Sequence, residues 1–366
     1  MTKSPLLRPT LLPGLPRIWR GPHTLQLGID PARAVLLDLP DPRAARLLDL
    51  LDGTRPERVV LAQAADDGVA TGDARELLDT LHTAGLVVPA ASLLPSSTPE
   101  DQRRRLSGEA TALALHRSAG APAPAQILRR RGLARVVVAG RGRLGAGIAV
   151  ALAQAGVGHV YPDLIGAVTP AELAGGPLRA ADVGRPVAGA VAEAVNRAAP
   201  ETHTHPVRRG AASLVVQLGY HQPVALLAAG HARRRQPHLA VAIRAGSAVV
   251  GPFVAASGAP CLNCLDLHRR ERDPGWPELS AQLDGATPEP CGVATILAAT
   301  AYASAEALAF VDGRVPETHG AAVEVAAPGR FRRRTWPPHA ACDCASREHT
   351  ERLGRKAVSR PTRAIE

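Results

Sequence analysis

Short apolar runs and helical patterns alternate over the first part of the chain. Two apolar runs, at 24–28 and 34–37, flank an Asp-Pro turn signal, which predicts two short strands. Leucine-rich patterns at helical spacing over 45–51 and 77–86 predict two helices, and the Gly-Leu-Val-Val that follows returns to strand. We expect a small α+β winged-helix-like domain over residues 1–95, the alternative being a plain helical cap on the next domain.

The composition and the hydrophobic pattern of the chain change twice after this domain. Residues 96–130 are rich in Ser, Pro and Arg, which predicts a linker with one short helix around 110–116. From residue 135 onward, strand, glycine turn and helix patterns follow one another, so we expect an α/β domain over 131–345. The basic tail, 346–366, is expected to be disordered.

A glycine-rich turn opens the α/β part. The β-branched run Val136–Val138 feeds Gly140-x-Gly142-x-x-Gly145, followed by an alanine-rich helix and a second strand from residue 159. Such glycines allow a tight turn, close approach of a phosphate, and packing of the helix on the strand. Asp163 follows the second strand, where an acid that binds a ribose belongs. We predict a Rossmann-like unit, which either binds a nucleotide or retains the fold with an empty site.

Four cysteines form a metal-ligand pattern. A CxxC and a distant CxC supply four thiolates, the complement of a closed, structural zinc site. These residues are Cys261, Cys264, Cys342 and Cys344. Such a site would hold the C-terminal segment on the main domain and would leave no open position for catalysis. Reduced thiols or a disulfide are the alternatives, and His268 and His339 are nearby substitute ligands.

Other candidates carry weaker signals. Cys291 stands alone before a helical pattern at 293–310, which indicates a packing residue, with a reactive nucleophile as the alternative. His203 and His205 are expected on an exposed strand, the alternative being a pair of metal ligands. The arginines at 330–334 are expected on a solvated strand edge.

Composition narrows the class of protein. Of 366 residues, 43 are Lys or Arg and 33 are Asp or Glu, so the formal net charge is +10. Nine aromatic residues are too few for a base-stacking platform, so nucleic-acid binding is not expected. Only Lys3 and Lys356 are lysines, which excludes a mechanism that needs an internal lysine. No signal peptide or membrane span is predicted, and we expect a cytoplasmic protein whose cysteines stay reduced.

These motifs resemble the ThiF/MoeB superfamily of ubiquitin-activating-type adenylyltransferases over about residues 130–345. The resemblance rests on the strand–GxGxLG–helix unit, on Asp182-Val183-Gly184, and on the CxxC paired with a distal CxC. PCLNCLDLHRRERDPGWPELSAQL and TWPPHAACDC resemble an actinobacterial branch linked to cyclodehydratase partners and leader-peptide-binding proteins of thiazole/oxazole-modified peptide systems. The resemblance implies ATP at the glycine loop, a magnesium-binding Asp, a homodimer, and an N-terminal peptide-recognition winged helix.

The sequence departs from the superfamily pattern at its adenylation site. Arg143 replaces a glycine of the GxGGLG loop, and Arg185 stands near the position of an absent lysine. The metal-binding Asp is expected after a strand at 224–227, where the chain reads Ala-Ala-Gly-His. Between Glu201 and Asp266 there is no acidic residue at all. Arginines cannot replace a magnesium ligand, because they repel the cation.

The sequence therefore predicts a ThiF-family protein with a degenerate adenylation site. It would bind a precursor or leader peptide by strand addition and present it to a YcaO-type cyclodehydratase, with structural zinc and possible ATP as cofactors. The residues expected at the nucleotide are Gly140, Gly142, Arg143, Gly145, Asp163 and Arg185. The alternative is an active ATP-dependent adenylyltransferase of a peptide or carrier-protein C-terminus, in which Arg143, Arg179 and Arg185 supply the positive charge.

Overall fold

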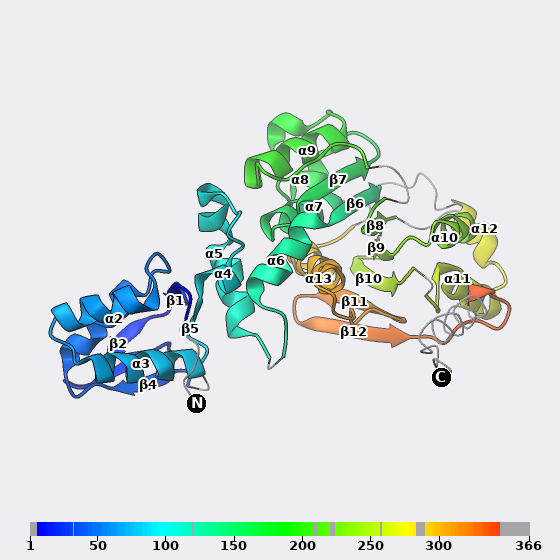
Figure 1. Ribbon diagram of the computed structural model, residues 1–366. Coiled ribbons are helices and arrows are strands. Elements are labelled where there is room, and N and C mark those ends of the chain that lie inside the picture. Colours follow the sequence, from blue (N-terminus) through cyan, green and yellow to red (C-terminus); the bar gives the residue numbers. More distant parts are fainter. Residues whose placement is uncertain are drawn as a thin grey trace, which may run out of the picture. The chain divides into compact units, whose positions relative to one another are not determined.

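The chain forms two compact units, Met1–Arg129 and Arg130–Glu366. The computed structural model describes residues 6–31, 33–118, 120–207, 211–219, 224–256, 258–282 and 290–344 (Figure 1). The basic tail at 346–366 lies outside the described residues. Each unit is taken by itself below.

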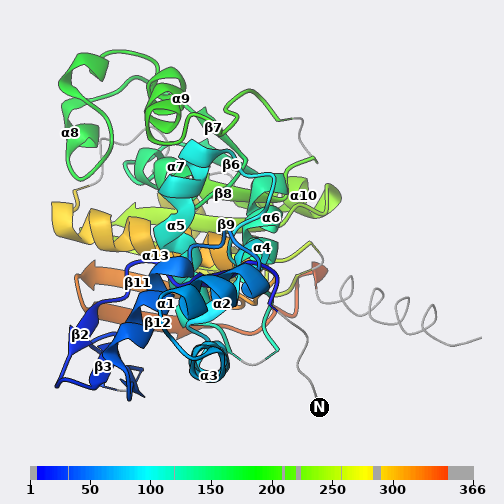
Figure 2. The same ribbon diagram turned by 60° about the vertical axis from the view of Figure 1, so that its left-hand side comes forward.

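The first unit combines short antiparallel strands with helices (Figure 2). Its strands are β1 (Pro9–Leu11), β2 (Arg17–Trp19), β3 (Thr24–Leu27), β4 (Val35–Asp38) and β5 (Val87–Pro89). Its helices are η1 (Pro42–Arg46), α1 (Leu47–Leu50), α2 (Glu57–Asp66), α3 (Thr71–Thr83), α4 (Ala90–Leu93) and α5 (Glu100–Leu115). β2, β3 and β4 form one sheet, and β1 pairs with β5. The strands predicted at 24–28 and 34–37 are present, whereas helix α2 was not predicted.

The segment expected to be a linker is largely helical. It contains α5 and most of α6 (Pro124–Leu133), and Leu106, Ala110 and Leu128 belong to the hydrophobic core of the first unit. The linker prediction rested on the Ser, Pro and Arg content of this stretch, but alanine is its commonest residue, and Leu106 and Ala110 are four residues apart, the spacing of one helix face. In the structure this stretch extends the first unit up to Arg129.

The second unit is an α/β domain built on a seven-stranded sheet, which confirms the predicted fold class. Its strands are β6 (Arg135–Gly140), β7 (His159–Leu164), β8 (Leu214–Leu218), β9 (His238–Arg244), β10 (Ser247–Val254), β11 (Ala321–Ala327) and β12 (Arg330–Thr335). Its helices are α7 (Gly145–Gln154), α8 (Pro170–Leu173), η2 (Ala180–Asp182), α9 (Val187–Ala198), α10 (Val224–Arg233), α11 (Leu262–Arg272), α12 (Trp276–Gln282) and α13 (Val293–Val311). The strand order is β12-β11-β10-β9-β8-β6-β7.

Parallel and antiparallel halves meet within this sheet. β7, β6, β8 and β9 are parallel, and β10, β11 and β12 continue the sheet as antiparallel neighbours. Alternate residues of β9 serve the two faces: Leu239, Val241 and Ile243 join the main core, while Ala240 and Ala242 pack with α10 and α11. Since both faces of a central strand are covered, β9 is apolar throughout most of its length.

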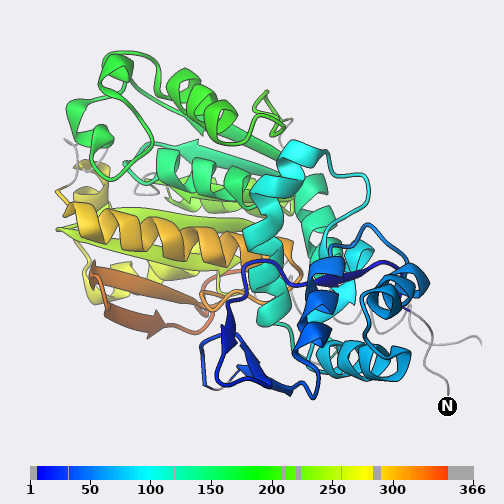
Figure 3. The ribbon, with the colours of Figure 1, turned by 90° about the vertical axis from the view of Figure 1, so that its left-hand side faces the viewer.

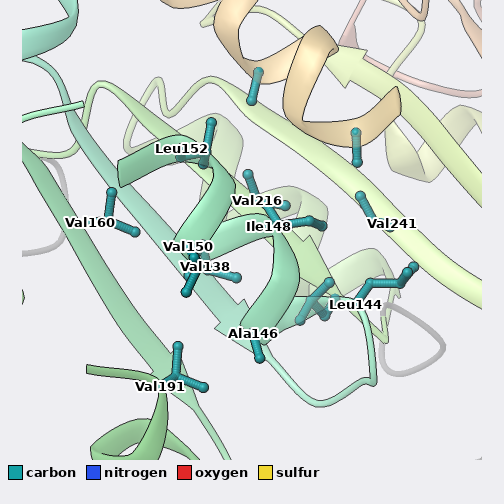
Figure 4. Close-up of a cluster of buried hydrophobic side chains, with 14 of the residues drawn as sticks. Val138, Leu144, Ala146, Ile148, Val150, Leu152, Val160, Val191, Val216 and Val241 are labelled. Atoms are coloured by element: carbon teal, nitrogen blue, oxygen red, sulfur yellow. The ribbon is translucent and has the colours of Figure 1, made fainter. Parts of the chain in front are cut away.

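The main core lies between the sheet and helices α7, α9 and α13 (Figure 3). Figure 4 shows Ile148 and Leu152 of α7 among Val138, Val216 and Val241 of the strands. Valine and alanine supply most of these contacts, because helices that carry small side chains can lie close to a sheet of β-branched residues.

Helix α13 is long and apolar enough to cross a membrane by length and composition, and within the described residues it is the one helix that is. Its Ile296, Ala299, Ala303 and Ala307 are fully buried in the main core. Its hydrophobicity is therefore explained by packing against β10, β11 and α7.

A buried ion pair holds α6 to the end of α13. The Arg131 guanidinium donates to both carboxylate oxygens of Asp312, at 2.7 and 2.9 Å, and also to the carbonyl of Ala155 at 3.0 Å. The side chains of Arg131 and Asp312 are only 3% and 1% exposed. The neighbouring Arg130 contacts only the carbonyl oxygen of Asp312 among the hydrogen bonds described, at 2.7 Å. The Arg-rich sequence around 129–131 gives no sign that one of its arginines is internal.

We predict that Arg131→Ala lowers the free energy of unfolding by about 3–5 kcal/mol, because it leaves the buried Asp312 carboxylate with only the largely exposed Arg314, 3.5 Å away, as a counter-charge. Arg130→Ala removes one hydrogen bond and should cost about 1 kcal/mol. Urea unfolding of the two variants checks this difference. Equal losses would contradict the assignment of a structural role to the buried pair.

Candidate functional site

The glycine loop lies at the carboxyl ends of three parallel strands. Gly140 ends β6 and is in register with Leu164 of β7 and Leu218 of β8. Helix α7 begins at Gly145, so the loop leads directly into the helix N-terminus. Open α/β sheets bind ligands at this edge, and a helix N-terminus there favours an anion. The predicted strand–loop–helix geometry is present.

Close packing accounts for two of the three loop glycines. A Cβ on Gly140 would lie 2.4 Å from the carbonyl oxygen of Leu218, and a Cβ on Gly145 would lie 2.7 Å from the side chain of Leu218. Gly142 differs, since a Cβ there meets nothing closer than 3.7 Å, but its φ of 155° is one that L side chains rarely adopt. Gly142 therefore shapes the loop and leaves space in front of it.

Arg143 turns toward the start of α13. Its Nη1 donates to the carbonyl oxygen of Cys291 at 3.1 Å, and the arginine is partly buried. Asp163 lies opposite Ala139 in the register of β6 and β7, close to the glycine loop in the sheet. Arg143 thus links the loop to the residue before helix α13, and Asp163 is at the edge where the ribose acid was expected.

Arg185 lies near this edge in a small ionic cluster. Its guanidinium donates to Asp182 at 2.8 Å and pairs with both oxygens of Glu193. Glu193 is the main cause of the raised pKa of Arg185, and the backbone N–H of Arg179 is the main cause of the lowered pKa of Asp182. Two carboxylates already neutralise Arg185, so its role at a phosphate stays a prediction.

The prediction of a strand at 224–227 is wrong, because these residues form the first turn of helix α10. The strand beside the glycine loop is β8, ten residues earlier in the chain, and it ends in Gln217-Leu218-Gly219. The Gln217 amide donates to the carbonyls of Ala139 and Leu218, at 3.4 and 3.1 Å. Apolar residues such as Val-Ala-Leu-Leu suit either element, and only the pairing of the strands decides between them.

The four predicted cysteines converge in one buried cluster. Their sulfur atoms all lie within 4.8 Å of one another, with Cys261 and Cys342 at 3.6 Å and Cys264 and Cys344 at 3.2 Å. Tetrahedral Zn–S bonds of about 2.3 Å would place sulfur atoms about 3.8 Å apart, close to this arrangement. Asn263 donates to the sulfur of Cys342 at 3.4 Å, as outer partners of bound thiolates do. The cluster can hold a metal ion.

Local structure brings the two cysteine pairs together. Cys261 is the N-cap of α11 and Cys264 lies in its first turn, so both face the same side of the helix start. The CxC follows β12 about 80 residues later in the chain. Hydrogen bonding among the thiols raises the pKa of Cys261 to about 12 and raises that of Cys344, while it lowers that of Cys264. A divalent cation removes this competition by binding all four as thiolates.

His268 and His339 adjoin the cysteines without replacing any of them. Nε2 of His339 lies 2.8 Å from Glu271, and its Nδ1 accepts from the backbone N–H of Ala341 at 3.1 Å. The backbone N–H of His339 donates to the sulfur of Cys264 at 3.4 Å. His339 therefore supports the cluster through its loop.

Of the remaining candidates, Cys291 lies in a packing environment, whereas His203 and His205 are exposed. Cys291 is partly buried against the main core and precedes Gly292, the N-cap of α13. His203 pairs with His159 beside β7, and the His205 ring lies 4.3 Å from the His159 ring between centroids. Within the described residues, these histidines do not converge as metal ligands. Burial is the main cause of the lowered pKa of His159.

Sequence reasoning missed a second histidine pair, which lies at the opposite end of the parallel strands from the glycine loop. His231 of α10 and His238 of β9 stack with ring centroids 4.1 Å apart and border a cavity of about 760 Å³ next to the cysteines. Burial lowers the pKa of His231 to about 3 and that of His238 to about 4, so both are neutral at pH 7. Their seven-residue separation gave no signal, because it becomes a contact only when α10 turns back into β9.

No family model and no curated protein matches the sequence. Among solved structures, E. coli MccB with succinimide has a TM-score of 0.61 at 14% identity, covering 92% of this chain and 99% of its own. MccB with AMPCPP and MccA has a TM-score of 0.59 at 14% identity, covering 91% and 98%. PaaA has a TM-score of 0.58 at 14% identity, covering 88% and 98%. The chain thus shares the fold of MccB and PaaA over nearly its whole length.

We predict that the purified protein contains about one zinc ion per chain and that Cys264→Ser removes it. Loss of the metal should lower Tm by more than about 5 °C, because a bound structural metal contributes to folding directly. Cys291→Ala is the matched control and should keep the metal with a smaller change in Tm. Elemental analysis and thermal unfolding check this. A Cys264→Ser protein with unchanged metal content would contradict the site.

Proposed function

We propose that this protein binds a precursor peptide and presents it to a partner modifying enzyme, with an adenylation site that no longer carries out the full reaction. One observation supports the claim of an incomplete adenylation site. Strand β8 ends beside the glycine loop in Gln217, Leu218 and Gly219, none of which is acidic. No acidic residue occurs between Glu201 and Asp266, so β8, β9 and β10 offer no carboxylate for magnesium. Phosphoryl and adenylyl transfer depends on such a metal to align the phosphates.

The arginines near the loop support the same proposal. Arg143 is engaged with the carbonyl of Cys291, and Arg185 with Asp182 and Glu193. A phosphate would have to displace these partners before either guanidinium could bind it. Zinc at the four cysteines would be structural in this proposal, since four thiolates leave no open coordination position.

The peptide-binding part of the proposal rests on the shared fold and on the first unit. MccB has been crystallised with MccA in N-formylated and isoasparagine forms, which are modifications of a polypeptide, and the match to this chain is long enough to include both units. In the first unit, Ile18 and Leu36 lie on the same face of the small sheet, in register through Gln26, and are 40% and 55% exposed. Exposed apolar side chains on a short sheet are typical of a peptide-binding surface.

We propose that this unit is the winged-helix-like peptide-recognition module, with β2 or β4 as the edge that accepts a peptide strand. Both are edge strands of the described three-stranded sheet. The further parts of the proposal are a cytoplasmic location, a homodimer formed by the second unit and a YcaO-type partner. Sedimentation of the intact protein and co-purification with the partner enzyme test the last two.

The second candidate function is an active adenylyltransferase. It is favoured by the intact geometry of Gly140, Gly142 and Gly145 and by Asp163 at the predicted ribose position. MccB structures contain ATP and AMPCPP, so a protein of this fold does bind the nucleotide.

Calorimetric titration with ATP distinguishes the two functions. We expect weak or no binding, with no gain from magnesium, because no carboxylate at β8 recruits the ion. Gln217→Asp is the informative variant, and it should introduce a magnesium dependence if ATP binds at all. Magnesium-dependent binding and pyrophosphate exchange by the unaltered protein would overturn the degenerate-site proposal.

The peptide surface is tested with peptides selected from a displayed random library against the intact protein. Leu36→Asp should weaken their binding by about tenfold or more, since it places a charge in the apolar contact. Leu7→Asp is the matched control, because Leu7 is 81% exposed and lies outside the small sheet. Similar losses in both variants would count against the proposed surface.

A further inference from the structure

The second unit contains a basic cavity apart from the glycine loop and the four-cysteine cluster. It has a volume of about 980 Å³ and lies on the outer face of β10, β11 and β12 beside helix α11. We call it the arginine trough, after the four arginines that line it: Arg244, Arg269, Arg272 and Arg334. Glu271 and Glu324 are its only acidic lining residues among those described.

The floor of the trough is the sheet face turned away from the core. Val323 and Val325 of β11 pack in the main core, whereas Ala322 and Glu324 alternate with them and face the other way. In the register of the strands, Ala322 pairs with Arg334 on β12. This places arginine side chains along the outer face, where no apolar packing would explain them.

The charge in the trough is unbalanced. Glu324 is bonded to Arg334 at 2.9 Å, and Glu271 lies 2.8 Å from His339. With four guanidinium groups and two carboxylates, the trough carries an excess of two positive charges when its histidine is neutral. A concave surface lined by one sign of charge concentrates the field and attracts the opposite charge.

Helix α11 carries three arginines, of which two line the trough and one does not. Arg270 is paired with the buried Asp266 at 2.7 Å, which is outside the trough lining. Arg269 and Arg272 are three residues apart and so share a helix face, the one that lines the trough. The guanidinium of Arg269 also lies 5.0 Å from the centre of the Trp276 ring, which orients it.

We propose that the trough binds an extended, acidic peptide segment whose carboxylates pair with these arginines. Arginines from three elements, β9, α11 and β12, border one cavity, so several carboxylates along a chain can pair with more of them than a single anion can. β12 is the last strand of the described sheet and pairs only with β11 there, which leaves an edge for an extended backbone. Each guanidinium fork can hold a carboxylate by two hydrogen bonds. The natural ligand would be an acidic stretch of the peptide that the proposed function requires.

The test uses the full-length, metal-loaded protein and a fluorescein-labelled hexaglutamate peptide with blocked ends. Fluorescence anisotropy should show saturable binding that weakens as salt is added. Arg272→Glu should weaken it by about tenfold or more, because it removes one charge-assisted contact and adds repulsion. Arg233→Glu is the matched control: this exposed arginine lies on α10 outside the trough, and the change in net charge is the same.

Four outcomes would overturn the proposal. The first is an absence of saturable hexaglutamate binding to the unaltered protein. Equal losses in Arg272→Glu and Arg233→Glu would reduce the effect to overall charge. Stronger competition by tripolyphosphate than by unlabelled hexaglutamate would indicate a phosphate site, and displacement by a short DNA duplex would indicate nucleic acid. Leu36→Asp should leave hexaglutamate binding unchanged, so failure of the trough and failure of the peptide surface on the first unit are distinguishable.

Discussion

The second unit depends on the close approach of helix α7 to the strands beneath it. Gly145 at its start leaves no room for a side chain against Leu164 and Leu218, and a Cβ on Gly147 would lie 2.9 Å from Thr300 of α13. Helices α7 and α13 can therefore lie close to the sheet and to each other, and small residues fill the core between them. The same approach fixes the glycine loop at the ends of β6, β7 and β8, where a ligand of this fold would bind.

The parallel half and the antiparallel half of this sheet carry different features. The parallel half ends in the glycine loop, Asp163 and Gln217, while the antiparallel half carries the arginine trough on its outer face. The four-cysteine cluster joins the start of α11 to the segment that follows β12, about 80 residues later. A metal held there would fix the trough wall formed by α11 relative to β12, so the structural site and the basic surface depend on each other.

At the glycine-loop edge, the residues that shape the fold are distinct from those that would act on a ligand. The glycines that shape the loop are constrained by packing against Leu218, and this constraint remains whether or not ATP binds. Arg143 and Arg185, which were predicted to lie at a nucleotide, are held by other partners: Arg143 by a main-chain carbonyl and Arg185 by two carboxylates. Fold and function are therefore separate conclusions for this protein.

The sequence by itself determined the elements whose signals are local: the strand–glycine–helix unit from Val136 to Gly145, helix α13, and the two cysteine pairs. The spacing of residues within each of these elements follows from local backbone geometry, so it can be recognised without the tertiary structure. Only the tertiary structure decided that 224–227 is helix and not strand, that Arg131 is buried against Asp312, and that residues 96–129 belong to the first unit. It also placed Gln217 beside the loop and arginines from three elements around one trough. These relations join residues that are far apart in the chain. They are fixed by burial and by strand pairing, and neither produces a periodic pattern in the sequence.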